Sequence, residues 1–141
     1  MTNKEQGITS PEIYRIVDAN LNRLREGIRV VEDICRYLNN DEKLSKALKE
    51  LRHKARVPNY KDFLTCRDVQ TDPLKQTTQS EKKRSNIESI ILSNIKRAQE
   101  SARVLEEVLK LQNTEQAELF KQIRYELYDL EKKILLEDKE G

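Results

Sequence analysis

A stretch of fourteen residues that begins at Asn20 occurs a second time, in altered form, from Asn94. Six of the fourteen positions are identical, whereas chance would give about one. The identical residues of the first copy are Asn20, Arg23, Glu26, Arg29, Val30 and Glu32. A duplicated chain is expected to fold into two similar units. Because packing alone would preserve apolar positions, the repeated charges also indicate a shared role.

Both copies lie within apolar residues that recur at alternating spacings of three and four, the period of an amphipathic helix. A helix start is predicted at Ser10-Pro11, a second helix over 41–56, a third from Ser80-Glu81 and a fourth after Asn113-Thr114. Few glycines and prolines (3 of each) and 37% charged residues favour long helices. The prediction is all-α: an antiparallel bundle of two duplicated helical hairpins, more than three quarters helical and without a sheet.

The length of 141 residues predicts a single helical domain over 1–141. The internal repeat covers 13–56 and 87–128. Residues 58–79 are rich in Thr, Gln and Asp and form the one long segment without helical spacing. A loop of this length in a compact domain is more often functional or mobile than idle, so we expect part of the site there.

Several functional classes are excluded or disfavoured by composition. The net charge is only +2 with acids and bases interspersed, which does not indicate a nucleic-acid-binding face. No apolar run approaches the ~18 residues that a membrane span needs. Cys35 and Cys66 lack metal-ligand spacing and are expected to be reduced thiols of a cytoplasmic protein. Phosphate-binding glycine loops, zinc-protease motifs and serine-hydrolase motifs do not occur.

The charged residues of the repeat can be grouped by the helix face that they share. One face of the first copy and its counterpart in the second carry Asn22, Glu26, Arg29, Asp33, Arg36, and Lys96, Glu100, Arg103, Glu107, Lys110. Two such stripes facing each other would enclose a polar cleft, where arginines grip phosphate and carboxylates hold Mg²⁺. Ordinary surface ion pairs, worth a few tenths of a kcal/mol each, explain the same pattern equally well.

The chain resembles a small helical domain of bacterial thiamine biosynthesis, a family described as a monofunctional hydroxymethylpyrimidine-phosphate kinase. This domain often precedes a thiamine-phosphate synthase barrel and sometimes stands alone. The resemblance covers 13–132. The motifs that carry it are Asp18-Ala-Asn20-Leu-Asn22-Arg23-x-Arg25-Glu26-Gly27-x-Arg29-Val30-Val31-Glu32-Asp33, Leu51-Arg52-His53, Arg67-Asp68 with Asp72, Ser80-Glu81 with Arg84, Asn94-x-Lys96-Arg97-Ala98-Gln99-Glu100, and Arg103-Val104-Leu105-Glu106-Glu107.

The resemblance implies ATP as phosphoryl donor, Mg²⁺ as its metal, and 4-amino-5-hydroxymethyl-2-methylpyrimidine phosphate as acceptor. The chain departs from the family pattern where Pro73 follows Asp72, because family members carry a glycine and a small hydroxyl residue there. The synthase barrel needs at least ~200 residues and does not fit into this chain.

The residue predictions combine the repeat with the resemblance. Arg29, Asp33 and Arg103 are predicted as catalytic, with Asp33 and Glu107 as metal ligands. The predicted substrate- and phosphate-binding residues are Asn20, Asn22, Arg23, Glu26, Arg52, Arg67, Asp68, Asn94, Arg97 and Glu100.

Two alternatives to a kinase remain open. The chain is a non-catalytic bundle that docks onto thiamine-phosphate synthase, or it is a dimerisation module that forms a homodimer with charges paired across chains. A catalytic cleft would turn Arg29 and Arg103 inward together with Glu26 and Glu100. A scaffold would leave these four side chains on separate solvated faces.

Overall fold

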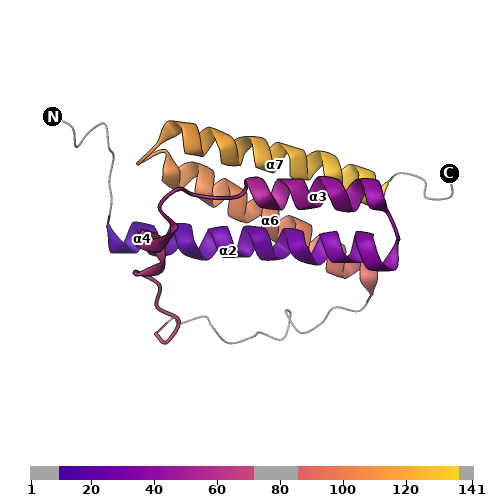
Figure 1. Ribbon diagram of the computed structural model, residues 1–141, viewed down its shortest axis with the longest axis horizontal. Coiled ribbons are helices and arrows are strands. Elements are labelled where there is room, and N and C mark those ends of the chain that lie inside the picture. Colours follow the sequence, from indigo (N-terminus) through magenta and orange to yellow (C-terminus); the bar gives the residue numbers. More distant parts are fainter. Residues whose placement is uncertain (1–9, 72–85, 137–141) are drawn as a thin grey trace.

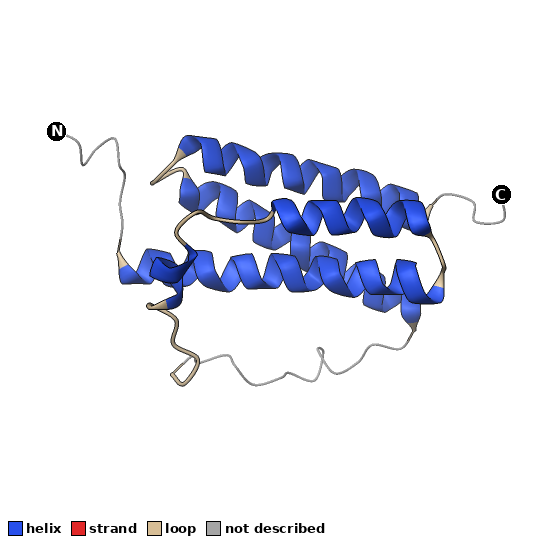
Figure 2. Ribbon diagram, in the orientation of Figure 1, coloured by secondary structure: helices blue, strands red, loops and turns tan. Residues whose placement is uncertain are grey.

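The computed structural model of the chain describes residues 10–71 and 86–136 (Figure 1). Helices make up 81% of these residues, and the described part contains no strand (Figure 2). The elements are α2 (Pro11–Asp33), a short π-helical turn η1 (Ile34–Leu38), α3 (Glu42–Lys54), α4 (Tyr60–Leu64), α6 (Ile87–Leu109) and α7 (Thr114–Leu135). The predicted all-α bundle is thereby confirmed. None of the described helices has the length and apolar character of a membrane span.

The four long helices form two antiparallel hairpins, α2–α3 and α6–α7 (Figure 1). α2 packs along α6 at the centre, and each of these helices also packs against the second helix of its own hairpin. α3 touches α7, and α4 packs against α2. The apolar stripes predicted from the sequence meet in one core, which contains Leu24, Ile28, Ile95, Leu105 and Ile123, each 1% exposed or less.

Side-chain caps fix where the helices begin. Ser10 accepts a hydrogen bond from the Ile13 amide and so caps α2, as predicted. Asp41 caps α3 in the same way, and Asn113 caps α7 by accepting from two amides. α6 begins after Asn86 with a capping box. The predicted helix start at Ser80-Glu81 lies outside the described residues.

Two local features differ from the sequence prediction. The segment predicted as irregular contains the single-turn helix α4, whose Phe63 is 1% exposed. The first helix also does not run unchanged to its end, because η1 widens its last turn. There the Asn39 amide donates to the Ile34 carbonyl, five residues back.

Equivalent residues of the two hairpins make the same buried contact. Arg52 of α3 donates through Nε and Nη2 to Glu32 of α2, at 2.7 and 3.2 Å. Arg124 of α7 donates through the same two nitrogens to Glu106 of α6, at 2.9 and 3.2 Å. Both glutamates are buried. Part of the repeated charge pattern therefore serves to join the two helices of each hairpin.

The central helices approach each other closely at Gly27. A Cβ added there would lie 2.8 Å from the backbone carbonyl oxygen of Asn94, which is closer than real Cβ contacts. A glycine is therefore required for α2 to lie this near α6. The corresponding position of the repeat is the buried Ser101, so the other half of the contact accommodates a Cβ.

Candidate functional site

An ion pair between the exposed Arg67 and the buried Asp18 fixes the segment after α4 onto α2. Arg67 donates Nε and Nη2 to the two carboxylate oxygens of Asp18, at 2.7 and 2.8 Å, and Nη2 also to the Tyr60 hydroxyl. Asp18 is 3% exposed. The hydrogen bonds to Asp18, and then that to Tyr60, raise the pKa of Arg67 above its ordinary value. Phe63 packs on Tyr14 with ring centroids 4.6 Å apart, which anchors α4 itself.

This arrangement forms an open pocket of about 470 Å³ between α2 and the residues that follow α4. We call it the α2–α4 pocket. Its lining residues are Glu12, Arg15, Ile16, Asp18, Ala19, Asn20, Asn22, Arg23, Arg67, Asp68 and Val69. Pockets for small ligands have volumes in this range. Three guanidinium groups and two amides supply donors of the kind that bind phosphate, and three carboxylates lie beside them.

The rim of the α2–α4 pocket at Asp68 is a hydrogen-bonded turn. The Asp68 carboxylate accepts from the Thr71 hydroxyl at 2.6 Å and from the amides of Gln70 and Thr71. The Thr71 hydrogen bonds are the main cause that lowers the pKa of Asp68 below its ordinary value. The carboxylate is therefore charged at neutral pH and holds the turn beside Arg67. The neighbouring Asp72 of the sequence prediction lies outside the described residues.

A second concave region, of about 250 Å³, continues along α2 from the first. We call it the α2–α3 hollow. It is lined by Asn22, Arg25, Glu26, Arg29 and Arg52. Asn22 also lines the α2–α4 pocket. Apart from Asp33, the predicted site residues of the first repeat therefore line two adjoining depressions along α2.

The ThiD2 family profile matches residues 15–133 of the chain. The chain belongs to the ThiD2 family. It is 38% identical over 124 residues to a Nostoc punctiforme protein named thiamine-phosphate synthase. The aligned segment covers 87% of this chain and 35% of that protein. A Thermosynechococcus vestitus protein of the same name is 35% identical over 137 residues, covering 96% of this chain and 39% of its own length. The chain thus spans little more than a third of these relatives. No solved structure matches it.

The predicted residues of this ThiD2 family member divide between its two halves. Nine of them lie on or near the two depressions or on α2, namely Asn20, Asn22, Arg23, Glu26, Arg29, Asp33, Arg52, Arg67 and Asp68. The other five lie on α6 and line neither depression, namely Asn94, Arg97, Glu100, Arg103 and Glu107. Asn20 and Asn94 each donate a side-chain amide hydrogen to the carbonyl four residues back.

The two predicted catalytic arginines do not face each other. Arg29 and Arg103 have side chains 55% and 56% exposed, and each pairs with the acid four residues later on its own helix. Gly27 is level with Asn94 and Ala98 on the antiparallel α6. Arg103 is therefore displaced from Arg29 by roughly ten residues, or about 15 Å along the helix axis. Glu26 and Glu100 are exposed as well. These positions match the arrangement expected for a scaffold at this place.

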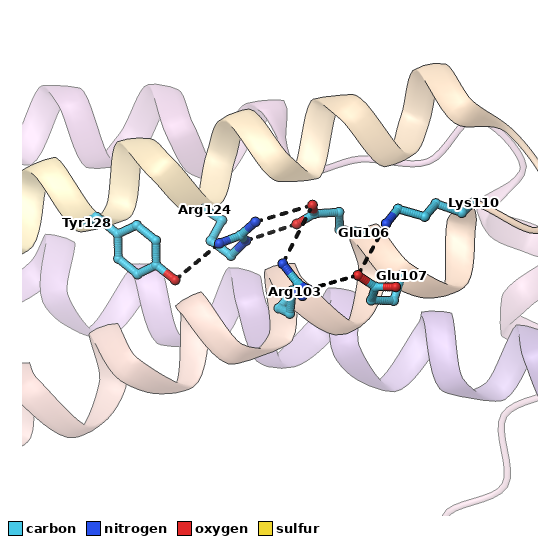
Figure 3. Close-up of polar contacts among 6 residues, drawn as sticks. All are labelled: Arg103, Glu106, Glu107, Lys110, Arg124 and Tyr128. Atoms are coloured by element: carbon cyan, nitrogen blue, oxygen red, sulfur yellow. Dashed lines mark hydrogen bonds and ion pairs between the residues drawn. The ribbon is translucent and has the colours of Figure 1, made fainter.

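The predicted metal ligands of the ThiD2 family member are paired with cations. Asp33 lies 3.4 Å from Arg29, and Glu107 contacts both Arg103 and Lys110 (Figure 3). Within 10–71 and 86–136, no three His, Cys, Asp or Glu residues gather as a metal site would require. A Mg²⁺ ion that arrives with substrate phosphates uses only one or two protein carboxylates, so the magnesium role of Asp33 and Glu107 stays a prediction.

Several residues of this architecture, among them Asp18, Arg25 and Glu106, were absent from the predicted set. Asp18 and Arg25 lie on α2 at spacings of three or four from Leu21, within or beside its apolar row. A charged residue in or beside an apolar row was the sequence signal that could have marked these two positions. Glu106 was recognisable as the repeat of Glu32, but its buried pairing with Arg124 became evident only when α7 was seen against α6.

Proposed function

We propose that the chain binds a phosphorylated pyrimidine of thiamine biosynthesis in the α2–α4 pocket and phosphorylates it with ATP, giving the pyrimidine diphosphate. The observation that carries the proposal is the convergence of Arg15, Arg23 and Arg67 with Asn20 and Asn22 on one pocket. These groups bind phosphate oxygens as a fork or through single hydrogen bonds. The sequence resemblance supplies the identity of the substrate.

The residues present fit ATP and Mg²⁺ in chemical type. Phosphoryl transfer depends mainly on positioning and on neutralising charge, which arginines and a metal ion provide without a glycine-rich loop. Of the lining residues, Glu12 and Asp68 would hold Mg²⁺, which would supply charge neutralisation at the phosphates, since no described cation holds either carboxylate in a short ion pair. Two hydrogen bonds to Asp18 hold Arg67 in place, so we assign to it a fixed wall of the pocket. We assign the contacts with phosphate to Arg15 and Arg23. Such an enzyme is expected in the cytoplasm, where ATP is available.

A second candidate function is a non-catalytic domain that docks onto thiamine-phosphate synthase. Two observations favour it. The relatives carry that name and are nearly three times as long as the shared segment, and the repeated arginines Arg29 and Arg103 lie on solvated surfaces. The relatives' names speak more directly for this alternative than for kinase activity.

One experiment separates the two functions. The purified chain is incubated with ATP, Mg²⁺ and 4-amino-5-hydroxymethyl-2-methylpyrimidine phosphate, and ADP is followed over time. We expect turnover that falls by at least ~10-fold in Arg23→Gln, because a charge-assisted hydrogen bond contributes about 1.5–3 kcal/mol. Arg97→Gln, the corresponding change on α6, is the matched control and should retain activity.

Absence of turnover in the wild-type chain would reject the kinase. The docking alternative would then be tested by calorimetric titration of the chain with purified thiamine-phosphate synthase. Binding without ADP formation would support docking, and absence of binding, verified by co-elution in size-exclusion chromatography, would reject it too.

A further inference from the structure

The surroundings of the Glu–Arg pair differ between the two hairpins. In the second hairpin, the remaining guanidinium nitrogen of Arg124, Nη1, donates to the Tyr128 hydroxyl at 3.3 Å (Figure 3). The Arg124 guanidinium also lies 4.9 Å from the Tyr125 ring centroid and 5.8 Å from that of Tyr128. All three nitrogens of Arg124 therefore have protein partners, and the pair with Glu106 is covered by α7.

One turn further along, α7 also satisfies the donors of α6. Glu131 accepts from the Gln99 side chain at 2.7 Å and pairs with Lys96 at 3.1 Å. Gln99 is buried. In the second hairpin, a tyrosine hydroxyl and a carboxylate of α7 thus accept hydrogen bonds along the groove between α6 and α7.

The first hairpin keeps the paired arginine, Arg52, but lacks these acceptors. α3 ends at Lys54, and the positions that correspond to Tyr128 and Glu131 are Arg56 and Asn59, beyond the end of the helix. Arg25 corresponds to Gln99, and its Nε is buried without a hydrogen-bond partner among the described residues. The α2–α3 hollow is lined by the counterparts of Lys96, Gln99 and Arg124, which contact Glu131 and Tyr128 in the second hairpin.

We propose that the α2–α3 hollow binds a phosphate group, whose oxygens take the places that the Glu131 carboxylate and the Tyr128 hydroxyl take in the second hairpin. Arg25 is the first donor. Its Nε is buried without an acceptor among the described residues, which costs about 1–3 kcal/mol, so the side chain gains a hydrogen bond by turning toward a bound phosphate. Arg52 is the second donor, through the nitrogen that Glu32 does not use. Arg29, on the rim, adds positive charge.

The acidic residue of the hollow limits the binding in a measurable way. Glu26 lines the same surface and repels an anion. Arg52 is already neutralised by Glu32, so Arg25 contributes the positive charge that no described carboxylate balances. Moderate affinity for a free phosphate anion follows, and it should increase when the Glu26 charge is removed.

The inference deepens the proposed function, on which its biological meaning rests. The proposed reaction has two phosphate-bearing ligands, ATP and the pyrimidine phosphate, which must lie side by side, and the hollow and the α2–α4 pocket meet at Asn22. Binding of an anion to the hollow can nevertheless be measured without turnover, so the two proposals fail independently.

The test is calorimetric titration of the full chain with inorganic pyrophosphate at low ionic strength. Arg25→Gln introduces the residue that the second hairpin has at this place and should weaken binding by about tenfold or more. Arg29→Gln should weaken it less, by a few-fold, and Glu26→Gln should tighten it. Arg103→Gln, the counterpart of Arg29 in the filled half, is the control and should leave the affinity unchanged. Thermal unfolding of each variant verifies that it is folded.

Wild-type affinity in Arg25→Gln, or equal losses in Arg29→Gln and Arg103→Gln, would overturn the inference. Loss of pyrophosphate binding in Arg23→Gln but not in Arg25→Gln would assign the anion to the α2–α4 pocket instead, leaving the proposed function standing. Binding that depends on Arg25 in a chain without kinase turnover would support the hollow and reject the kinase.

Discussion

The two hairpins share an inner framework and differ on the outside. In both, a glutamate of the central helix holds an arginine of the second helix through two hydrogen bonds, away from solvent. In the second hairpin α7 covers that arginine with Tyr128, whereas in the first α3 ends early and leaves an open hollow. The comparison teaches that part of the repeated charge pattern is structural, and that the open hollow lies where the repeats diverge.

The two central helices, α2 and α6, show the same contrast at Asp18 and its counterpart Leu92. Asp18 on α2 is buried and held by Arg67, which forms a wall of the α2–α4 pocket. The corresponding residue of α6 is Leu92, which is 41% exposed. A charged residue inside one half thus replaces an apolar residue on the surface of the other.

The largest expected effect tests the shared framework. Glu32→Ala and Glu106→Ala each leave a guanidinium buried without its partner, so each should lower the free energy of unfolding by about 3–5 kcal/mol. Urea denaturation measures the change. Glu107→Ala removes an exposed neighbour and should cost less than ~0.5 kcal/mol. A large loss in one hairpin only would show that the two pairs are not equivalent.

The next effect concerns Asp18 on α2 and its counterpart Leu92 on α6. Asp18→Ala removes two charge-assisted hydrogen bonds to a guanidinium that is one third exposed, and the loss should be about 1.5–3 kcal/mol. Leu92→Ala at the corresponding site should change stability by less than ~0.5 kcal/mol, because the side chain is already exposed. Thermal unfolding compares the two variants, and equal shifts would remove the contrast between the two positions.

A smaller effect is expected at the central crossing. Gly27→Ala places a Cβ against the Asn94 carbonyl, which is backbone and cannot move alone. Overpacking costs typically 1–3 kcal/mol, and the better helix propensity of alanine returns up to ~1 kcal/mol. A net loss of about 1 kcal/mol should appear in urea denaturation, whereas Ser101→Ala should be nearly neutral. Stabilisation by Gly27→Ala would contradict the close approach.

The smallest effect is local and depends on pH. The lowered pKa of Asp68 means that its carboxylate stabilises the turn fully above the ordinary aspartate value of about 3.9 and loses this contribution as the pH falls through the lowered pKa. The NMR amide shifts of Gln70 and Thr71 should therefore titrate with a midpoint below 3.9. Thr71→Ala should raise that midpoint, because Thr71 is the main cause of the shift. An unchanged midpoint in the variant would reject this assignment.

The long helices could be predicted because burial on one face repeats with the helical period, and capping residues such as Ser10 and Asn113 mark their starts. α4 could not, because five residues with one buried ring, Phe63, leave no periodic signal. Superposition of 13–56 on 87–128 remains the direct test of the duplication.

The site was predictable only in part. Arg67 and Asp68 were expected on a loop near the substrate, and they do line the α2–α4 pocket. Their fixation by Asp18 joins residues 49 positions apart, and a single sequence does not show which distant residues meet. For the same reason, Arg29 and Arg103 carried equal weight in the sequence although the antiparallel packing separates them.

The widened turn η1 bears on how this bundle tolerates insertions and deletions. The paired glutamate and arginine are 20 residues apart in the first hairpin and 18 in the second. A π-helical turn contains one residue more per hydrogen-bonded ring than an α-helical turn. The extra chain of the first hairpin is thus taken up at its tip, between Ile34 and Asp41, and the register of Glu32 against Arg52 is preserved. Insertions or deletions of one or two residues should therefore be accepted at the hairpin tips. Within the helices they should be rejected, because they would shift the register of the paired residues.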